Sequence, residues 1–328
     1  MEDINYYEKV RQNLTLGPLK THKHKKVIQL MKVLWNEEEI KLLSHFNKAG
    51  NWITKQQLAE RSNIPKDQIK KILSRSVKIG TIASKINKYS LLPIIPGIFE
   101  KYFIARKDTE ENQKKAARLY RDIMKEVLPQ NLYASEGRAF RPLLPYDAKE
   151  KLIEINKSLD YKSQALPYEL VKQLIDDNEY FAVIPCQCRL IGELSGEPCD
   201  VAPAEMGCFL VGPAAQNIAY RCDDARILTK EEAIQFLKDT EKAGLVHNSD
   251  FGSGQSGVFI CNCCSCHCGA LYPARLMHIK GTKTSNFNPK INMELCVKCE
   301  TCVKKCPGEA IFHIWPKESD SSDEIMVV

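Results

Sequence analysis

The chain has 328 residues, 14 cysteines and a formal net charge of +6 at pH 7. Hydrophobic residues make up 44% and charged residues 27%, which is typical of a globular chain long enough for two or three domains. No apolar run approaches the ~20 residues of a membrane-spanning helix, and the polar, acidic start MEDINYYEKV does not resemble a secretory signal. We therefore expect no membrane span and a cytoplasmic location.

The positive charge lies in the first 90 residues, which hold 18 Lys and Arg against 8 Asp and Glu, whereas the remainder carries a net charge of −4. Residues 36–92 show a helix-turn-helix pattern, with a helix around Leu58, a turn at 63–65 and a second helix that ends at Gly80. The apolar positions of the second helix are Ile69, Ile72, Leu73 and Val77. With TIASKINKYSLL as a two-stranded wing, the pattern predicts a winged-helix-like domain over residues 1–95.

The second helix of this pattern carries polar residues that would lie largely on its exposed face: Lys66, Gln68, Lys70, Lys71, Arg75 and Lys78. A basic face of this kind is typical of a helix that contacts nucleic acid. The alternative is a packing or dimerisation module whose lysines keep it soluble, because fold shape alone does not decide function. DNA binding and a homodimer are therefore both open at this point.

Residues 96–180 are predicted to form a helical connector, through the stretches IARKDTEENQKKAARLYRDIMKEVL and ALPYELVKQLIDDNEY. A domain over 181–250 follows, in which Thr229 and Glu232 form a capping box for a helix that ends at Gly244. The acidic, Ser-rich end of the chain predicts a disordered tail over 317–328.

All cysteines follow residue 185, and their clustering with two-residue gaps is typical of metal binding rather than of a disulfide framework. The first group comprises Cys186, Cys188, Cys199 and Cys208. These thiols fit one four-thiolate site for a third cluster, with zinc as the alternative, or some of them complete a site further along the chain. Cys222 stands alone and is treated as a plain residue.

The most diagnostic motif is CVKCETCVKKCPGEAIF, which matches the C-x₂-C-x₂-C-x₃-C-P run of bacterial [4Fe–4S] ferredoxins. The predicted cluster ligands are Cys296, Cys299, Cys302 and Cys306, followed by Pro307. The flanking INMEL and AIFHIW are expected to supply short strands of a ferredoxin-like dicluster domain over 251–316. Zinc is disfavoured, because its sites usually consist of two separated cysteine pairs.

In two-cluster ferredoxins the fourth cysteine of this run binds the other cluster, so further thiolates are required. The stretch CNCCSCHC can supply them through Cys261, Cys263, Cys264, Cys266 and Cys268. Which four take part is open, since the stretch contains two overlapping C-x-x-C pairs. The C-x-x-C-H haem motif within it is set aside because the chain lacks an export signal, and the histidines 247 and 267 are not assigned as ligands.

The stretch GSGQSG contains Gly252, Gly254 and Gly257 in the G-x-G-x-x-G spacing of dinucleotide-binding loops. That motif must follow a strand and open a helix. Here polar HNSD precedes it and apolar VFIC follows it, so we interpret it as an ordinary Gly/Ser loop.

These motifs together resemble a family of uncharacterised 4Fe-4S ferredoxin-type proteins of anaerobic archaea and bacteria. The shared stretches, as they stand here, are YSLLPIIPGIFE, LPYELVKQLI, CQCR, GEPCD, GCFLVG, TKEEAI, GLVH, CNCCSC and the ferredoxin run. The resemblance implies two or more iron–sulfur clusters and an electron-transfer role with no assigned substrate. Relatives often have cysteine at the position of His267, which favours its neighbours as ligands.

The sequence therefore predicts an α+β fold and an iron–sulfur protein that passes single electrons from a low-potential donor to a redox partner protein. Two [4Fe–4S] clusters are expected, and a third cluster or a zinc ion on the upstream cysteines is left open. One alternative is a redox-sensing regulator, in which the cluster alters DNA contact by the winged helix. Another is an oxidoreductase subunit with an open catalytic cluster. The sequence does not decide whether the chain is itself an enzyme.

Overall fold

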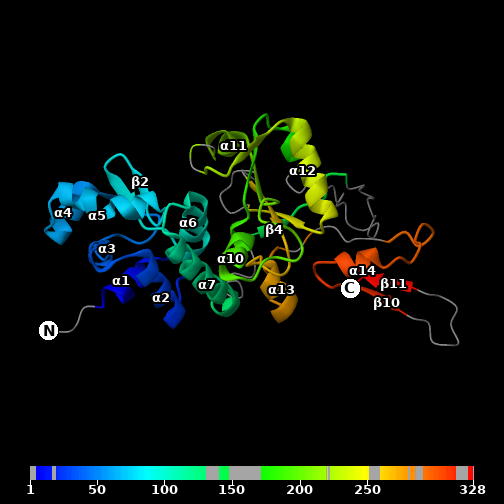
Figure 1. The fold of residues 1–328 in the computed structure, drawn as a ribbon, viewed down its shortest axis with the longest axis horizontal. Coiled ribbons are helices and arrows are strands. Elements are labelled where there is room, and N and C mark those ends of the chain that lie inside the picture. Colours follow the sequence, from blue (N-terminus) through cyan, green and yellow to red (C-terminus); the bar gives the residue numbers. More distant parts are fainter. Residues whose placement is uncertain are drawn as a thin grey trace, which may run out of the picture. The chain divides into compact units, whose positions relative to one another are not determined.

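The structure is a computed structural model (Figure 1). The chain divides into two compact units. Unit 1 comprises Met1–Ser135, Gln187–Cys199 and Tyr220–Asp224, and unit 2 comprises Glu136–Cys186, Asp200–Ala219 and Ala225–Val328. The chain mixes helices and strands, as the predicted α+β class requires. The residues that the structure describes are 5–16, 20–130, 140–147, 171–218, 220, 222–250, 259–279, 281–283, 285, 291–314 and 324–327.

Unit 1 is mainly helical. Its α-helices are α1 (Tyr6–Asn13), α2 (Lys25–Leu34), α3 (Glu37–Leu43), α4 (Lys55–Ser62), α5 (Lys66–Lys78), α6 (Phe99–Ala105), α7 (Glu110–Glu126) and α10 (Gln187–Ser195). A kinked segment, η1 (Ile94–Ile98), precedes α6, and its three central residues have non-helical backbone angles. A small antiparallel sheet has the strand order β1-β3-β2, with β1 at Ile53–Thr54, β2 at Ala83–Lys85 and β3 at Lys88–Ser90.

The predicted helix-turn-helix elements are present as α4 and α5, and β2 and β3 form the expected hairpin after them. Asn63 ends α4 in the left-handed conformation, with a φ of 55°, which Asn tolerates better than most residues. The buried face of α5 differs from the prediction by one position, since Val77 is 37% exposed and Ser76 is fully buried. Ser76 is buried because its hydroxyl donates a 2.8 Å hydrogen bond to the buried carboxylate of Glu39.

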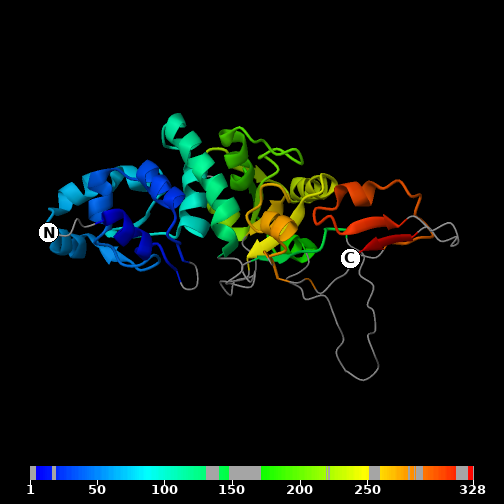
Figure 2. The ribbon, with the colours of Figure 1, turned by 90° about the horizontal axis from the view of Figure 1, so that it is seen from below.

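The helices α7 and α10 pack side by side within unit 1, although 60 residues lie between them in the sequence (Figures 1 and 2). Glu197, just after α10, accepts hydrogen bonds from Arg121 at 3.0 Å and from Lys125 at 3.1 Å. This pairing explains why the structure divides the chain differently from the predicted segments. The predicted 181–250 domain contributes α10 to unit 1.

Unit 2 is built around a six-stranded antiparallel sheet with the strand order β4-β8-β9-β6-β5-β7. These strands are β4 (Phe140–Pro142), β5 (Phe181–Ile184), β6 (Cys208–Val211), β7 (Arg226–Leu228), β8 (Val246–Asp250) and β9 (Phe259–Cys263). The helices of this part are α9 (Val171–Asp176), α11 (Gly212–Ile218), α12 (Lys230–Lys242) and α13 (Leu271–Met277).

One face of this sheet forms the apolar core of unit 2 against α9 and α12. Phe181 of β5, Phe209 of β6 and Ile260 of β9 lie in the same buried cluster as Leu237 of α12. Side chains alternate between the two faces of a strand, so the residues beside Phe209 and Ile260 point to the opposite face. Those neighbours include Cys208 and Cys261.

The helix α12 confirms the predicted capping box. The Thr229 hydroxyl accepts a hydrogen bond from the Glu232 N–H, and the Glu232 carboxylate accepts one from the Thr229 N–H. After its C-cap at Ala243, Gly244 takes a φ of 87°, which only glycine adopts without strain.

The C-terminal part of unit 2 contains α14 (Thr301–Lys305) and a two-stranded antiparallel ribbon of β10 (Ile311–Ile314) and β11 (Glu324–Val327) (Figure 2). AIFHIW supplies β10 as expected, but INMEL forms no strand. It forms a turn instead, because the Asn292 side chain accepts the Glu294 N–H at 3.0 Å and asparagine favours turns.

The predicted disordered tail is wrong for residues 324–327, which form β11 and pair with β10. The sequence EIMV combines β-branched and apolar residues that favour strands, and β10 offers an edge for pairing. The loop with Gly252, Gly254 and Gly257 and the first six residues of ALPYELVKQLIDDNEY lie outside the described residues, and the rest of that stretch contains α9. Among the described helices, none is long and apolar enough to span a bilayer.

Candidate metal centres

The ferredoxin-type run lies on a loop and a single helical turn. Cys296 and Cys299 precede α14, Cys302 lies within it, and Cys306 follows it as the C-cap. Lys298 and Glu300 have positive φ angles (55° and 56°), so the loop that leads from Cys296 to α14 turns sharply at these residues. Cys299 is exposed and the other three thiols are partly buried. The run is therefore accessible from solvent on one side.

Two hydrogen bonds to sulfur support thiolate chemistry in this run. The Thr301 hydroxyl lies 3.3 Å from the Cys299 sulfur, and this hydrogen bond lowers the pKa of the Cys299 thiol, with the nearby Lys304 ammonium as a smaller cause. The Ala310 N–H donates to the Cys306 sulfur at 3.3 Å. Such donors favour the thiolate form and are also the groups that tune iron–sulfur clusters. The donor set therefore fits a soft, thiolate-binding metal group.

A second set of thiols lies on the sheet face opposite the apolar core. In the antiparallel pairing of β6 and β9, Phe209 faces Ile260, so the next pair in this register is Cys208 and Cys261. Their sulfur atoms are 3.8 Å apart. Cys263 follows Cys261 by two residues and therefore lies on the same face of β9.

The turn after β9 brings Cys268 back to Cys263. The Cys268 N–H donates to the Cys264 carbonyl at 3.3 Å, and both Cys263 and Cys268 are buried in one cluster with Ala270. Cys263 accepts hydrogen bonds from the thiols of Cys261 and Cys268, and these bonds hold the pKa of Cys263 well below its usual value. Burial alone would raise that pKa, so the contacts between the sulfurs outweigh it.

A third set consists of Cys264, Cys266 and His267 in the same turn. Their ligand atoms all lie within 4.8 Å of one another, and the His267 Nδ1 is 3.2 Å from the Cys266 sulfur. The sequence left His267 unassigned, but the structure places its imidazole among the thiols. Two cysteines and a histidine form a donor set suited to zinc or to iron.

The four upstream cysteines are divided between the two units of the structure. Cys186 and Cys208 belong to unit 2, whereas Cys188, in α10, and Cys199 belong to unit 1. Cys208 lies beside Cys261 of the 261–268 stretch, and the sequence had left open that some upstream thiols complete a site there. Ligand roles for Cys186, Cys188 and Cys199 stay predictions.

Gly207, directly before Cys208, allows the chain to pass very close to the backbone at the end of β5. An added Cβ at Gly207 would lie 2.0 Å from the Ile184 carbonyl oxygen and 2.4 Å from the Cys186 nitrogen. Both atoms belong to backbone that cannot move aside as a flexible side chain can, so only glycine fits here. The close approach brings the residue before β6 against the end of β5.

A buried polar network, absent from the sequence predictions, holds the cysteine-bearing strand on its core face. Asn262 donates through its side chain to the Gly207 carbonyl at 2.7 Å, and its Oδ1 faces the His247 Nδ1 at 2.7 Å. The His247 Nε2 lies 3.0 Å from the Glu241 carboxylate. Both ring nitrogens of His247 therefore have side-chain hydrogen-bond partners. His247 is thus structural, and polar residues between cysteines were the only sequence signal for this network.

The comparisons with known proteins agree with the ferredoxin-type run. The family described as "4Fe-4S binding domain" (Fer4) matches residues 289–312. Neither the curated proteins nor the solved structures contain a match to the chain. The chain therefore carries a ferredoxin-type 4Fe–4S-binding segment at these residues, and the rest of its chemistry must be argued from its own side chains.

The predicted nucleic-acid face of α5 is only partly available. Lys66, Lys70, Lys71 and Lys78 are exposed. Arg75 instead pairs with two nearly buried carboxylates, at 3.1 Å from Glu39 and 3.1 Å from Asp108. Arg75 is a structural residue of unit 1, and the exposed basic face consists of lysines.

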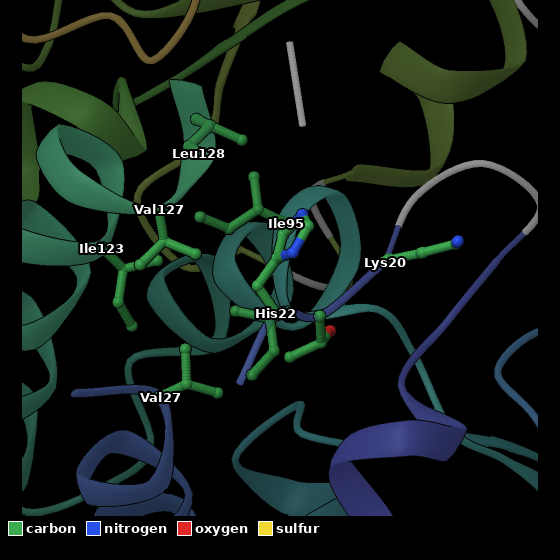
Figure 3. A pocket seen from close by; sticks show the side chains of 9 residues that line it. Lys20, His22, Val27, Ile95, Ile123, Val127 and Leu128 are labelled. Carbon is green, nitrogen blue, oxygen red and sulfur yellow. The ribbon is translucent and has the colours of Figure 1, made fainter. Parts of the chain in front are cut away.

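Unit 1 also contains a small pocket, and no described cysteine is among the residues that line it (Figure 3). Its lining is mostly apolar, and Figure 3 shows Val27, Ile95, Ile123 and Val127 around it together with His22. Thr21 and Lys20 complete its polar part. This composition gives no nucleophile–base pair and no metal-ligand set, so the cysteines remain the candidate functional groups.

Proposed function

We propose that this chain is an iron–sulfur electron-transfer protein that holds a [4Fe–4S] cluster on Cys296, Cys299 and Cys302. The observation that carries the proposal is the C-x₂-C-x₂-C-x₃-C-P run, which coincides with the segment matched as a 4Fe–4S binding domain. A bound cluster of this type accepts and releases single electrons. In the dicluster arrangement, Cys306 ligates a second cluster together with cysteines of the 261–268 stretch.

The residues around the run support exchange of electrons with a partner protein. Leu295 and Val297 flank Cys296 and are 78% and 81% exposed, and Cys299 itself is exposed. Exposed apolar side chains beside a redox group provide a docking surface that a carrier needs for close approach. The amide N–H of Ala310, which donates to the Cys306 sulfur, favours added negative charge on that ligand.

The test compares Cys299→Ala with Cys222→Ala in the full chain, purified without oxygen. Cys299 is exposed, so its removal should leave the fold intact, while Cys222 is a buried thiol of unit 1 outside the run. We expect Cys299→Ala to lose about four iron and four sulfide per chain, as one cube contains. Cys222→Ala should keep both. Equal iron and sulfide in the two variants would refute the assignment.

A second candidate function, favoured by the exposed lysines of α5, is a cluster-dependent regulator that binds DNA through a winged-helix domain. The order of α3, α4, α5 and the β2–β3 hairpin supports such a domain. The test measures binding of a random DNA duplex at several salt concentrations. The double variant Lys70→Glu/Lys71→Glu should weaken binding and flatten its salt dependence.

The matched control for this test is Lys114→Glu/Lys115→Glu, which makes the same charge change on exposed lysines of α7. Equal effects of the two double variants, or binding that does not change with salt, would remove the regulator from consideration.

A further inference from the structure

The turn that follows β9 gathers three side chains that can bind a metal ion. We propose that Cys264, Cys266 and His267 provide three ligands of one zinc ion, through two thiolates and one imidazole nitrogen. The ferredoxin-type run takes no part in this site, so the inference goes beyond the proposed function. It also gives His267 a ligand role that the sequence did not assign.

Backbone hydrogen bonds shape this turn. The Cys268 N–H donates to the Cys264 carbonyl at 3.3 Å, and the Tyr272 N–H donates to the Cys268 carbonyl at 2.9 Å. The strand β9 ends at Cys263, so Cys264 is the first residue beyond the sheet, and α13 begins at Leu271. The three proposed ligands are therefore carried by one short turn between a strand and a helix.

The ligand atoms of the three side chains lie close enough together for one ion. All of them are within 4.8 Å of one another, and the His267 Nδ1 is 3.2 Å from the Cys266 sulfur. Zinc–sulfur bonds of about 2.3 Å and zinc–nitrogen bonds of about 2.0 Å separate ligand atoms by about 3.5–3.8 Å at tetrahedral angles. The limit of 4.8 Å is near that range, so small rotations of the side chains are enough to bind the ion.

The same distances argue against two alternatives. In a [4Fe–4S] cube each thiolate binds a different iron, which requires wider spacing of the cysteine sulfurs than a single ion does. A thiolate–imidazolium pair without a metal needs only Cys266 and His267, whereas the Cys264 sulfur lies within the same 4.8 Å. Zinc is favoured over other ions because thiolate and imidazole are its usual ligands.

Burial of these side chains favours a bound cation. Cys264 is 2% exposed and His267 is 5% exposed, and Cys266 is partly buried. Buried thiolates are costly unless a cation or hydrogen bonds compensate them. Zinc displaces the thiol protons when it binds, and its two positive charges balance the two thiolates. The neutral imidazole adds no charge, so these three ligands and the ion are electrically balanced.

This assignment divides the CNCCSCHC stretch. It removes the two zinc-binding cysteines from the predicted cluster ligands and leaves Cys261, Cys263 and Cys268. Contacts between their sulfurs connect Cys263 to each of the other two. With Cys306 they supply the four thiolates that the second cluster of the proposed dicluster arrangement requires. Zinc takes a fourth ligand, a further thiolate or water, which the number of sulfurs around the ion identifies.

The experiment measures zinc, iron and acid-labile sulfide per chain in the full-length protein purified without oxygen. The variants are His267→Ala, His267→Cys and the control His278→Asn, which removes an exposed imidazole of unit 2 and keeps a residue that tolerates the left-handed backbone there. We expect about one zinc per chain in the wild type and at least about fivefold less zinc in His267→Ala. Zinc should be unchanged in His267→Cys, because a thiolate also binds zinc, and in the control. Sulfide should be the same in all four proteins.

X-ray absorption at the zinc edge tests the ligands directly, because the iron of clusters does not contribute to it. In the wild type we expect at least two sulfurs at about 2.3 Å and one imidazole nitrogen at about 2.0 Å. In His267→Cys we expect one sulfur more and no imidazole. This comparison answers the question even if His267→Ala fails to fold.

Three results would overturn the inference: no zinc in the wild type, zinc retained in His267→Ala, or a zinc spectrum of the wild type without an imidazole nitrogen. Loss of sulfide together with zinc in a folded His267→Ala protein would also overturn it, because the imidazole would then belong to a cluster-binding site. Absence of sulfide from a wild type that keeps its zinc would count against the proposed function alone.

Discussion

The substitution Asn262→Ala tests whether the polar network on the core face of β9 holds the cysteine-bearing strand in place. The side chain of Asn262 satisfies the buried Gly207 carbonyl at 2.7 Å and the His247 Nδ1 at 2.7 Å. Alanine would leave both groups without that partner. Each unsatisfied buried group costs about 1–3 kcal/mol, so the local stability of β8 and β9 should fall by about 2–6 kcal/mol.

Hydrogen exchange followed by mass spectrometry measures this change directly on peptides that cover β8 and β9. A loss of about 2 kcal/mol speeds exchange from locally opened states about 30-fold, since 1.36 kcal/mol is a factor of ten. The matched control is Asn217→Ala, in which an exposed asparagine of α11 loses a single bond to the Pro213 carbonyl. The control should change stability by no more than about 0.5 kcal/mol.

Exchange in β8 and β9 of Asn262→Ala that stays within about twofold of the wild type would refute this reasoning. It would mean that packing of the strand, rather than the network, holds β9 against the loop at Gly207. A change confined to unit 1 would contradict it equally, because the network lies within unit 2.

Three further predictions concern the two units. Arg75→Met should destabilise unit 1 by about 3–5 kcal/mol, because the two buried carboxylates of Glu39 and Asp108 lose their cation. Urea unfolding followed by Trp35 fluorescence measures this loss. The control Lys71→Met, at an exposed position of α5, should have little effect. Burial raises the pKa of the Glu100 carboxyl above its usual value of 4.5, so the free energy of unfolding should fall as the pH rises above 4.5. Glu100→Gln should abolish this pH dependence and raise the free energy of unfolding at pH 7. The same pH dependence in the variant and the wild type would contradict the prediction. Gly207→Ala should weaken the pairing of β5 with β6, because the added Cβ would lie 2.0 Å from the Ile184 carbonyl oxygen, so hydrogen exchange in these strands should become faster; unchanged exchange would argue against this close approach.

Local signals in the sequence predicted local structure well. The capping box at Thr229 and Glu232, and the helix that they begin, depend on residues within one turn and are present as predicted. The elements around α4 and α5 likewise follow from spacing and turn residues. The ferredoxin run could be recognised for the same reason, because its spacing within 11 residues carries the chemistry.

Features that depend on pairing between distant segments could not be predicted. Cys208 and Cys261 are 53 residues apart and meet only because β6 and β9 are neighbours in the sheet. A spacing argument grouped Cys208 with its nearest cysteines or with the later stretch, and it could not choose between the two. The role of Asn262 was hidden in the same way, since its partners lie on a different strand and on the loop before β6.

The burial of Ser76 was also not predicted, because it too depends on a residue of another element. Helical periodicity favoured Val77 for the core, but the carboxylate of Glu39 on α3 provides a partner that draws the serine inward. Similarly, the strand β10 was expected from AIFHIW, yet its partner is the tail at 324–327 rather than INMEL. The turn at Asn292 removes INMEL from that role.

The central claim is that thiolates of the ferredoxin-type run hold a redox-active iron–sulfur cluster. Its most direct test is electron paramagnetic resonance of the full-length protein, purified without oxygen and reduced with dithionite, together with iron and sulfide analysis. We expect brown protein with at least about four iron and four sulfide per chain and a signal from a reduced cluster. Colourless protein without acid-labile sulfide would contradict the claim.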